Sequence, residues 1–169
     1  MTEDGLGAFI NALAAPTATP GGGSASAAAG AMAAGLGGMV AGIAKLDGYD
    51  FDTPRRFLTA AVERDSTAYD KVMAAYKRPK AERKPFVEEA MREATLVPLE
   101  VAEHAVALRA TLARLAQEAP PRVASDVITA RALVEACLTG ALANVRINIA
   151  YLAEDEFRAM VESRAVPLT

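Results

Sequence analysis

Five polar residues stand in apolar surroundings and could do chemistry: Asp65, Glu103, Asp126, Asn144 and Asn148. The two asparagines are four residues apart, so one face of a helix would carry both amides. Buried amides need hydrogen-bond partners, so this pair either ties helices together or binds a polar ligand. Two carboxylates in different environments can divide the roles of general acid and general base.

Each carboxylate also has a purely structural interpretation. Asp65 could be an exposed residue that pairs with a nearby base, and Asp126 could cap the start of a helix. Glu103 follows Pro98 in an apolar run and could be buried. The neighbouring His104 is interpreted as a surface residue, because no residue close to it in the sequence would orient it as a base.

A glycine-rich segment precedes the most unusual helix of the sequence. Gly21, Gly22, Gly23 and Ser24 follow two prolines, and no charged residue occurs from Ser24 to Ala44. Small residues at a helix start leave backbone N–H groups open to an anion, and Ser24 is expected to be the N-cap. The same glycines could instead form a flexible connection.

The helix after this segment consists mostly of Ala, Gly and Ser. Each interior Gly costs about 1 kcal/mol relative to Ala, so its glycines must be offset by close approach of a neighbouring helix or a ligand. Its length would also allow a membrane span. It has few large apolar residues, no aromatic belt and no basic flank, so we expect a buried central helix and no membrane.

The apolar periodicity predicts an all-α fold. We expect a single domain over residues 1–169 that forms a helical bundle of about five to six helices. Thr53 is expected to cap a helix that has Pro54 at its first position, and Pro98 is expected to kink the fourth helix. The expected helices cover residues 3–14, 24–46, 53–76, 86–117, 127–152 and 154–164.

Composition narrows the classes of function. The net charge of -3 and the pI of about 5.3 give no reason to expect nucleic acid. The single Cys137 indicates a reducing compartment, and one Cys with one His does not make a His/Cys metal site. The acidic N-terminus lacks the layout of a signal peptide, so we expect a cytoplasmic protein. The basic turn, residues 77–84, is either simply solvated or attracts an anionic substrate.

Several blocks of the sequence resemble the cyclodeaminase/cyclohydrolase family. That family includes the C-terminal domain of formiminotransferase-cyclodeaminase and the stand-alone methenyltetrahydrofolate cyclohydrolases. The blocks occur in the family's order and span roughly residues 5 to 160: PTATPGGGSASAAAGAMAAGLGGMV, ERDSTAYDKVMAAYKRPK, ATLVPLEVAE, ASDVITA and GALANVRIN.

The resemblance implies an all-helical homodimer that acts on the one-carbon unit of tetrahydrofolate, with a folate as substrate, no cofactor and no metal. Where the family has basic residues after the glycine-rich helix, this chain keeps Lys45, a candidate contact for the glutamate tail. The positions carried over as ligand contacts are Gly21, Gly22, Gly23, Ser24, Asp65, Tyr69, Asp126, Asn144 and Asn148.

The function expected from this resemblance is hydrolysis of 5,10-methenyltetrahydrofolate to 10-formyltetrahydrofolate. Asp126 would be the base that activates water, and Asp65 would stabilise positive charge or shuttle the proton. The sequence contains no formiminotransferase segment, so we expect the stand-alone cyclohydrolase. The alternatives are a formiminotetrahydrofolate cyclodeaminase that releases ammonia and a non-catalytic helical module that binds a folate or a protein partner.

Overall fold

The computed structural model describes residues 3–153 and 155–168, and these residues form helices and connections without a strand. This confirms the all-α prediction. Short helical turns at Glu3–Gly7, Pro121–Val123 and Val166–Leu168 accompany six α-helices. The six are α1 (Ala8–Ala14), α2 (Gly22–Ala44), α3 (Asp52–Tyr76), α4 (Lys84–Glu118), α5 (Ala124–Ile149) and α6 (Glu156–Ala165).

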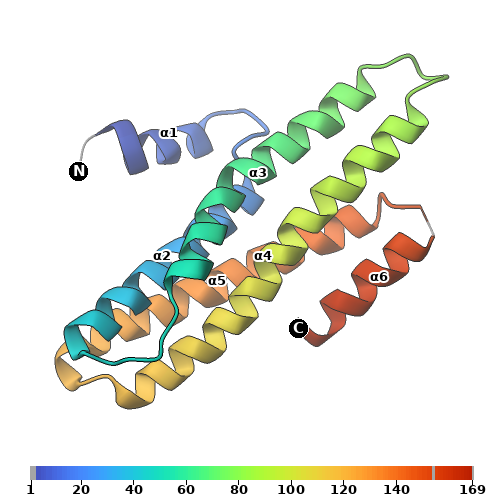
Figure 1. The fold of residues 1–169 in the computed structure, drawn as a ribbon. Helices are drawn as coiled ribbons and strands as arrows, with labels where there is room; N and C mark the ends of the chain where they lie inside the picture. Colours follow the sequence, from blue (N-terminus) through green and yellow to red (C-terminus); the bar gives the residue numbers. More distant parts are fainter. Residues whose placement is uncertain (1–2, 154, 169) are drawn as a thin grey trace.

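Helices α2 to α5 form an up-and-down four-helix bundle (Figure 1). Both α2 and α4 pack against α3 and α5, so the four helices enclose one core. The short helix α6 packs on α4 and α5. Helix α1 lies apart from the bundle and contributes no buried residue. The turn between α3 and α4 projects beyond the other helices of the bundle, at the upper right of Figure 1.

Glycines of α2 allow its neighbours to approach closely, as the sequence predicts. A Cβ added at Gly30 would lie 2.7 Å from Sγ of Cys137, and one added at Gly37 would lie 2.4 Å from the ring of Phe51. By length and hydropathy α2 would also qualify as a membrane span. The core helix of a bundle meets the same criteria, and the contacts of α2 with α3 and α5 account for its small residues. One face of α2 remains exposed.

Two predicted helix caps, Ser24 and Thr53, are wrong. Helix α2 begins at Gly22 with Gly21 as its N-cap, so Ser24 lies inside the helix and turns its hydroxyl toward α3. Helix α3 begins at Asp52, and the carboxylate of Asp50 accepts the N–H groups of Asp52 and Thr53. At α3 the carboxylate of Asp50 thus takes the capping role expected of Thr53, whereas the start of α2 has no side-chain cap.

The two ends of the chain also differ in detail from the prediction. The N-terminal segment is not one regular helix, because Gly5 has non-helical dihedral angles (φ -124, ψ -107) and only Ala8–Ala14 is α-helical. Helix α4 continues through Pro98 without interruption. Helix α6 begins after Asp155, whose carboxylate caps the N–H groups of Phe157 and Arg158.

Candidate functional site

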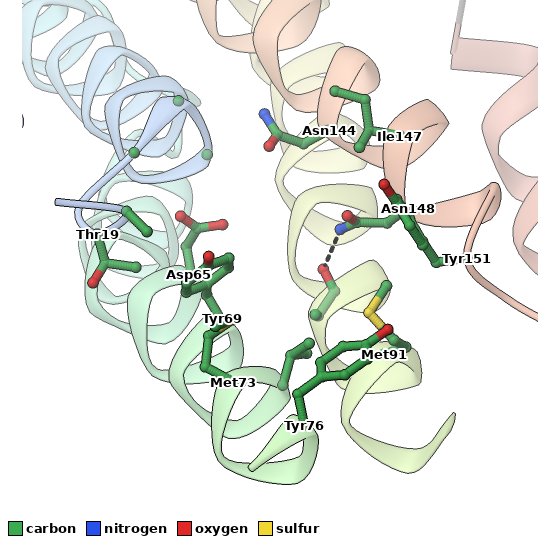
Figure 2. Close-up of a pocket in the computed structure, with 16 residues that line it drawn as sticks. Thr19, Asp65, Tyr69, Met73, Tyr76, Met91, Asn144, Ile147, Asn148 and Tyr151 are labelled. Carbon is green, nitrogen blue, oxygen red and sulfur yellow. Dashed lines mark hydrogen bonds between the residues drawn. The ribbon is translucent and has the colours of Figure 1, made fainter. Parts of the chain in front are cut away.

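A cavity of about 410 Å³ opens at one end of the bundle. This volume lies in the range of small-molecule sites. Four helices and the segment before α2 enclose it (Figure 2). Its walls consist of Ala18, Thr19, Gly21, Gly22, Gly23, Asp65, Tyr69, Val72, Met73, Tyr76, Met91, Ala94, Asn144, Ile147, Asn148 and Tyr151.

The cavity exists because α3 and α5 extend beyond the point in the bundle at which α2 begins. Gly23, in the first turn of α2, lies beside Asp65 of α3, and α3 then continues to Tyr76. The stretch from Asp65 to Tyr76 rises by about 16 Å. Over that length no turn of α2 fills the space between α3 and α5, which leaves an elongated site.

Asp65 is the carboxylate of this cavity, and it lies against the start of α2. A Cβ added at Gly23 would lie 2.2 Å from Oδ1 and 2.6 Å from Cγ of Asp65, so only glycine fits here. Burial raises the pKa of Asp65 above its ordinary value, while hydrogen bonds from the hydroxyl and the backbone of Ser24 oppose the rise. Such a carboxyl can take up and release a proton closer to neutral pH.

Ser24 supports Asp65 from behind and does not line the cavity. Its side chain is fully buried, and its Oγ lies 2.9 Å from Oδ2 of Asp65, 3.0 Å from the carbonyl oxygen of Val62 and 3.2 Å from Oγ of Ser66. A hydroxyl has one proton to donate. Asp65 and Val62 therefore compete for the proton of Ser24, and the hydroxyl of Ser66 can either donate to Ser24 or accept from it.

The two asparagines of α5 face the cavity from the opposite wall, as Figure 2 shows. Nδ2 of Asn148 donates to the carbonyl oxygen of Ala94 at 2.9 Å and so ties α5 to α4. Nδ2 of Asn144 donates to the carbonyl oxygen of Gly140 in its own helix at 2.8 Å. Within the described residues, neither Oδ1 oxygen has a hydrogen-bond partner. Asn148 thus fits both interpretations of the pair, and Asn144 fits the ligand-binding one.

The part of the cavity farther from α2 is apolar and aromatic. Tyr69, Met73 and Tyr76 of α3 line it together with Met91 of α4 and Tyr151, which follows the end of α5. All but Met91 are more than a third exposed. A flat aromatic ligand could pack against these side chains while its polar end reaches Asp65.

The structure brings together most of the ligand contacts expected from the sequence. Gly21, Gly22 and Gly23 line the cavity with Asp65, Tyr69, Asn144 and Asn148, and Ser24 contacts Asp65. It does not bring Asp126 or Lys45 there. Asp126 lies in the first turn of α5, about 27 Å along the helix from Asn144. Lys45 follows the last residue of α2, at the end away from Gly22.

Three other residues considered from the sequence have structural roles. Glu103 is half-exposed, not buried, and accepts two hydrogen bonds of 2.8 Å from Arg164. His104 stacks on Phe57 with ring centroids 3.8 Å apart. Cys137 belongs to the core, and burial raises its pKa to about 12, so its thiol stays protonated at neutral pH.

Sequence reasoning missed the apolar walls of the cavity, although a signal was present. Met73 and Tyr76 continue the helix face that carries Asp65 and Tyr69, and Tyr151 continues the face of Asn144 and Asn148. Residues three or four apart lie on one side of a helix. Extending each polar face by one turn would have identified these side chains.

Several known proteins are similar in sequence to this chain. The family model of formiminotransferase-cyclodeaminase matches residues 5–166. The formimidoyltransferase-cyclodeaminase of Rattus norvegicus is 32% identical over 97% of this chain and 34% of its own length. That of Gallus gallus is 30% identical over 90% of this chain and 32% of its own length. The chain thus spans about a third of these relatives.

A solved structure is similar over nearly the whole chain. The crystal structure of formiminotetrahydrofolate cyclodeaminase from Thermotoga maritima superposes with a TM-score of 0.84 and 28% sequence identity. The similarity covers 96% of this chain and 87% of that one. The helical arrangement that forms the cavity therefore has a counterpart in that protein.

Proposed function

Because the chain belongs to the formiminotransferase-cyclodeaminase family, we propose that it is a formiminotetrahydrofolate cyclodeaminase. It would convert 5-formiminotetrahydrofolate to 5,10-methenyltetrahydrofolate and ammonia. The names of the matching proteins support this reaction. The observation that carries the proposal is the half-buried carboxylate of Asp65, which faces a cavity of suitable size.

The reaction requires one proton to move between two nitrogens. In the substrate protonated on its formimino nitrogen, N10 attacks the formimino carbon and a C–N10 bond forms. N10 then loses its proton, the amino nitrogen gains one, and the bond from carbon to that nitrogen breaks as ammonia leaves. The product is the methenyl cation, so charge and atoms balance.

Asp65 can serve both halves of this transfer. As a carboxylate it stabilises the cationic formimino carbon and accepts the proton from N10. As a carboxylic acid it then donates that proton to the leaving nitrogen. Its pKa is raised by burial, which brings the two protonation states closer in energy at neutral pH. One carboxylate is sufficient, so this mechanism does not require Asp126.

The remaining polar groups would hold the pterin in place. The N–H groups of Gly22 and Gly23, in the first turn of α2, have no partner within the helix and can donate to a carbonyl oxygen of the ligand. Oδ1 of Asn144 and of Asn148 can accept from its ring or amino N–H groups. These contacts would keep N10 and the formimino carbon beside Asp65.

Hydrolysis of methenyltetrahydrofolate, the expected function from the sequence alone, becomes the second candidate. The same cavity would hold that substrate, and Asp65 would have to activate a water molecule. The expected partnership of Asp126 with Asp65 has no support within one chain, because Asp126 does not line the cavity. The names of the relatives also favour the cyclodeaminase.

The test supplies purified protein with 5-formiminotetrahydrofolate and follows both products. We expect ammonia and the methenyl chromophore to appear in equal amounts, and Asp65→Asn to lose this activity. Consumption of added methenyltetrahydrofolate without ammonia release from the formimino compound would replace the proposal with the cyclohydrolase. Binding of folates without either reaction would leave the non-catalytic module.

We further propose that the protein is a homodimer that uses the exposed face of α2. Met32, Met39 and Ile43 are 41 to 48% exposed and follow one side of this helix. A Cβ added at Gly35 or Gly42 would meet no atom within 4 Å, so a second copy could approach closely there. Light scattering should give twice the chain mass, and Met39→Lys should shift the protein to monomer. A monomeric wild-type protein would rule the dimer out.

A further inference from the structure

The side-chain amides of Asn144 and Asn148 are each held in one orientation. Nδ2 of Asn144 donates to the carbonyl oxygen of Gly140 at 2.8 Å, and Nδ2 of Asn148 donates to that of Ala94 at 2.9 Å. If either amide turned over, its oxygen would face a carbonyl oxygen, and two acceptors form no hydrogen bond. Within the described residues, Oδ1 of each amide is thus left for a ligand, and it can only accept.

Asn144 lies beside the same turn of α2 as Asp65. A Cβ added at Gly22 would lie 3.8 Å from Nδ2 of Asn144, and one added at the next residue, Gly23, would lie 2.2 Å from Oδ1 of Asp65. Figure 2 shows Asn144 on the wall opposite Asp65. The amide and the carboxylate therefore lie on two sides of the start of α2, with the cavity between them.

Asn148 lies one turn farther along α5, about 6 Å along the helix axis. Its amide bonds to α4 and not to its own helix. The residue that continues its side of α5, Tyr151, belongs to the aromatic wall of the cavity. The two asparagines thus present the same acceptor at two depths: Asn144 beside the start of α2, and Asn148 toward the aromatic wall.

The proposed substrate has a close analogue that lacks the leaving nitrogen. In a 5-formyl group an oxygen takes the place of the formimino nitrogen, and the two groups are nearly equal in size and shape. The protonated formimino nitrogen carries N–H donors and a positive charge, whereas the formyl oxygen is a neutral acceptor. A site can therefore separate the two groups only by the hydrogen bonds and the charge that it offers.

We propose that Oδ1 of Asn144 accepts a hydrogen bond from the formimino nitrogen, opposite Asp65, and so selects the formimino group against the formyl group. This inference rests on the proposed cyclodeaminase function. A formyl oxygen in the same place would face Oδ1 of Asn144 without a proton between them, and a site built for one hydrogen-bonding pattern rejects a ligand that lacks it. Asn148 is then the asparagine that contacts the pterin, which both compounds share.

A hydroxyl group would not select in this way. Thr19 and Tyr69 also line the cavity, but an O–H group can rotate to donate to a formyl oxygen or to accept from a formimino nitrogen. The amide of Asn144 has no such freedom, because Gly140 holds its Nδ2. The selectivity therefore depends on this amide.

The test measures kcat/KM for 5-formiminotetrahydrofolate and the inhibition constant of 5-formyltetrahydrofolate. In Asn144→Ala we expect kcat/KM to fall at least about tenfold, because a hydrogen bond to a charged group is lost. The inhibition constant of the formyl compound should stay the same or fall, since an opposing acceptor has been removed. Alanine is the best helix former, so this variant should fold normally.

Asn148→Ala is the matched control, because it removes the same amide one turn away. Loss of a pterin contact should weaken the formimino and the formyl compound by the same factor. The preference for the formimino compound should therefore shrink in Asn144→Ala and stay constant in Asn148→Ala. A merely structural role of Asn144 would instead weaken both compounds alike.

The outcomes separate this inference from the function on which it rests. If turnover is observed and Asn144→Ala weakens both compounds by the same factor, the role of Asn144 is overturned and the cyclodeaminase stays intact. A preference that changes only in Asn148→Ala would overturn that role as well. Absence of turnover of the formimino compound by the wild-type protein would overturn both.

Discussion

Oγ of Ser24 lies 2.9 Å from Oδ2 of Asp65, although the two residues come from different helices and are 41 positions apart. The same hydroxyl lies 3.0 Å from the carbonyl oxygen of Val62. When Asp65 is ionised, Ser24 can donate to it. When Asp65 is protonated, it can donate to Ser24, whose own proton then turns to Val62. The hydroxyl can thus satisfy Asp65 in both states that the proposed reaction needs.

Replacement of Ser24 should therefore change the pH dependence of the reaction. In Ser24→Ala the carboxylate loses a donor that lowers its pKa, so the pKa of Asp65 should rise further. The acidic limb of the pH profile of kcat/KM should move to higher pH. Ser26→Ala is the matched control, because Ser26 is also buried in α2 but donates to Gly22 of its own helix. Equal profiles for the two variants would contradict the role of Ser24.

Glycine at position 23 should be required for activity. In Gly23→Ala the new Cβ would overlap the carboxylate of Asp65, at 2.2 Å from Oδ1, and push it out of place. We expect kcat to fall at least tenfold, since a displaced general base loses most of its contribution. Gly38→Ala in the same helix would place its Cβ 3.5 Å from Cβ of Phe51, an ordinary van der Waals contact. It should keep full activity and gain up to about 1 kcal/mol of stability. Normal kcat for Gly23→Ala would show that Asp65 tolerates displacement.

Much of the fold was predictable because it depends on periodic apolar residues. The four long helices were located from their patterns, and the close contacts expected of the α2 glycines occur at Gly30 and Gly37 but not at Gly35 or Gly42. The helix starts were not predictable to the residue. Ser24 and Thr53 have the side chains of caps, but tertiary contacts decide which residue caps a helix: Ser24 has a better partner in Asp65 of α3.

The candidate site was predictable where its residues lie on short, adjacent segments. Asn144 and Asn148 share a helix face, and the glycines meet Asp65 because both belong to the contact between α2 and α3. Asp126 was included among the site residues because it belongs to a motif of the family, and a sequence motif does not specify distances in the folded protein. The helix expected over residues 127–152 already separates Asp126 from Asn144 by about 27 Å, and α5 of the structure confirms that one continuous helix connects the two.

The variant Asp126→Asn tests whether Asp126 is the catalytic base, as expected from the sequence, or lies outside the active site, as the structure indicates. Asp126 lies in the first turn of α5, where an acid interacts favourably with the helix dipole. We expect kcat and KM to stay within about twofold of wild type and stability to fall by at most about 1 kcal/mol. A tenfold or larger loss of kcat in a folded variant would return Asp126 to the active site and require a second copy of the chain to supply it.

Substitution of the two asparagines should have different effects on the stability of the protein and on substrate binding. Asn148→Ala removes the hydrogen bond that joins α5 to Ala94 of α4, so we expect a loss of about 1 kcal/mol of stability together with a higher KM. Asn144→Ala removes a bond within α5 only, so its KM should rise with little change in stability. Urea unfolding and substrate titration of both variants measure the two effects. Equal destabilisation by both would contradict this division.

Asp65 should lower stability while it supports activity. Its pKa in the folded protein is raised above the ordinary value of about 3.9. In the pH window between these two values the folded protein binds more protons than the unfolded chain, so the free energy of unfolding falls as pH rises through it. Asn cannot ionise, so Asp65→Asn should be as stable as wild type below about pH 4 and relatively more stable at pH 7, while turnover falls about 10²- to 10⁴-fold. Urea unfolding at pH 3.5 and pH 7 checks the sign. A variant that loses stability relative to wild type as pH rises would mean that the hydrogen bonds from Ser24 outweigh burial at this carboxylate.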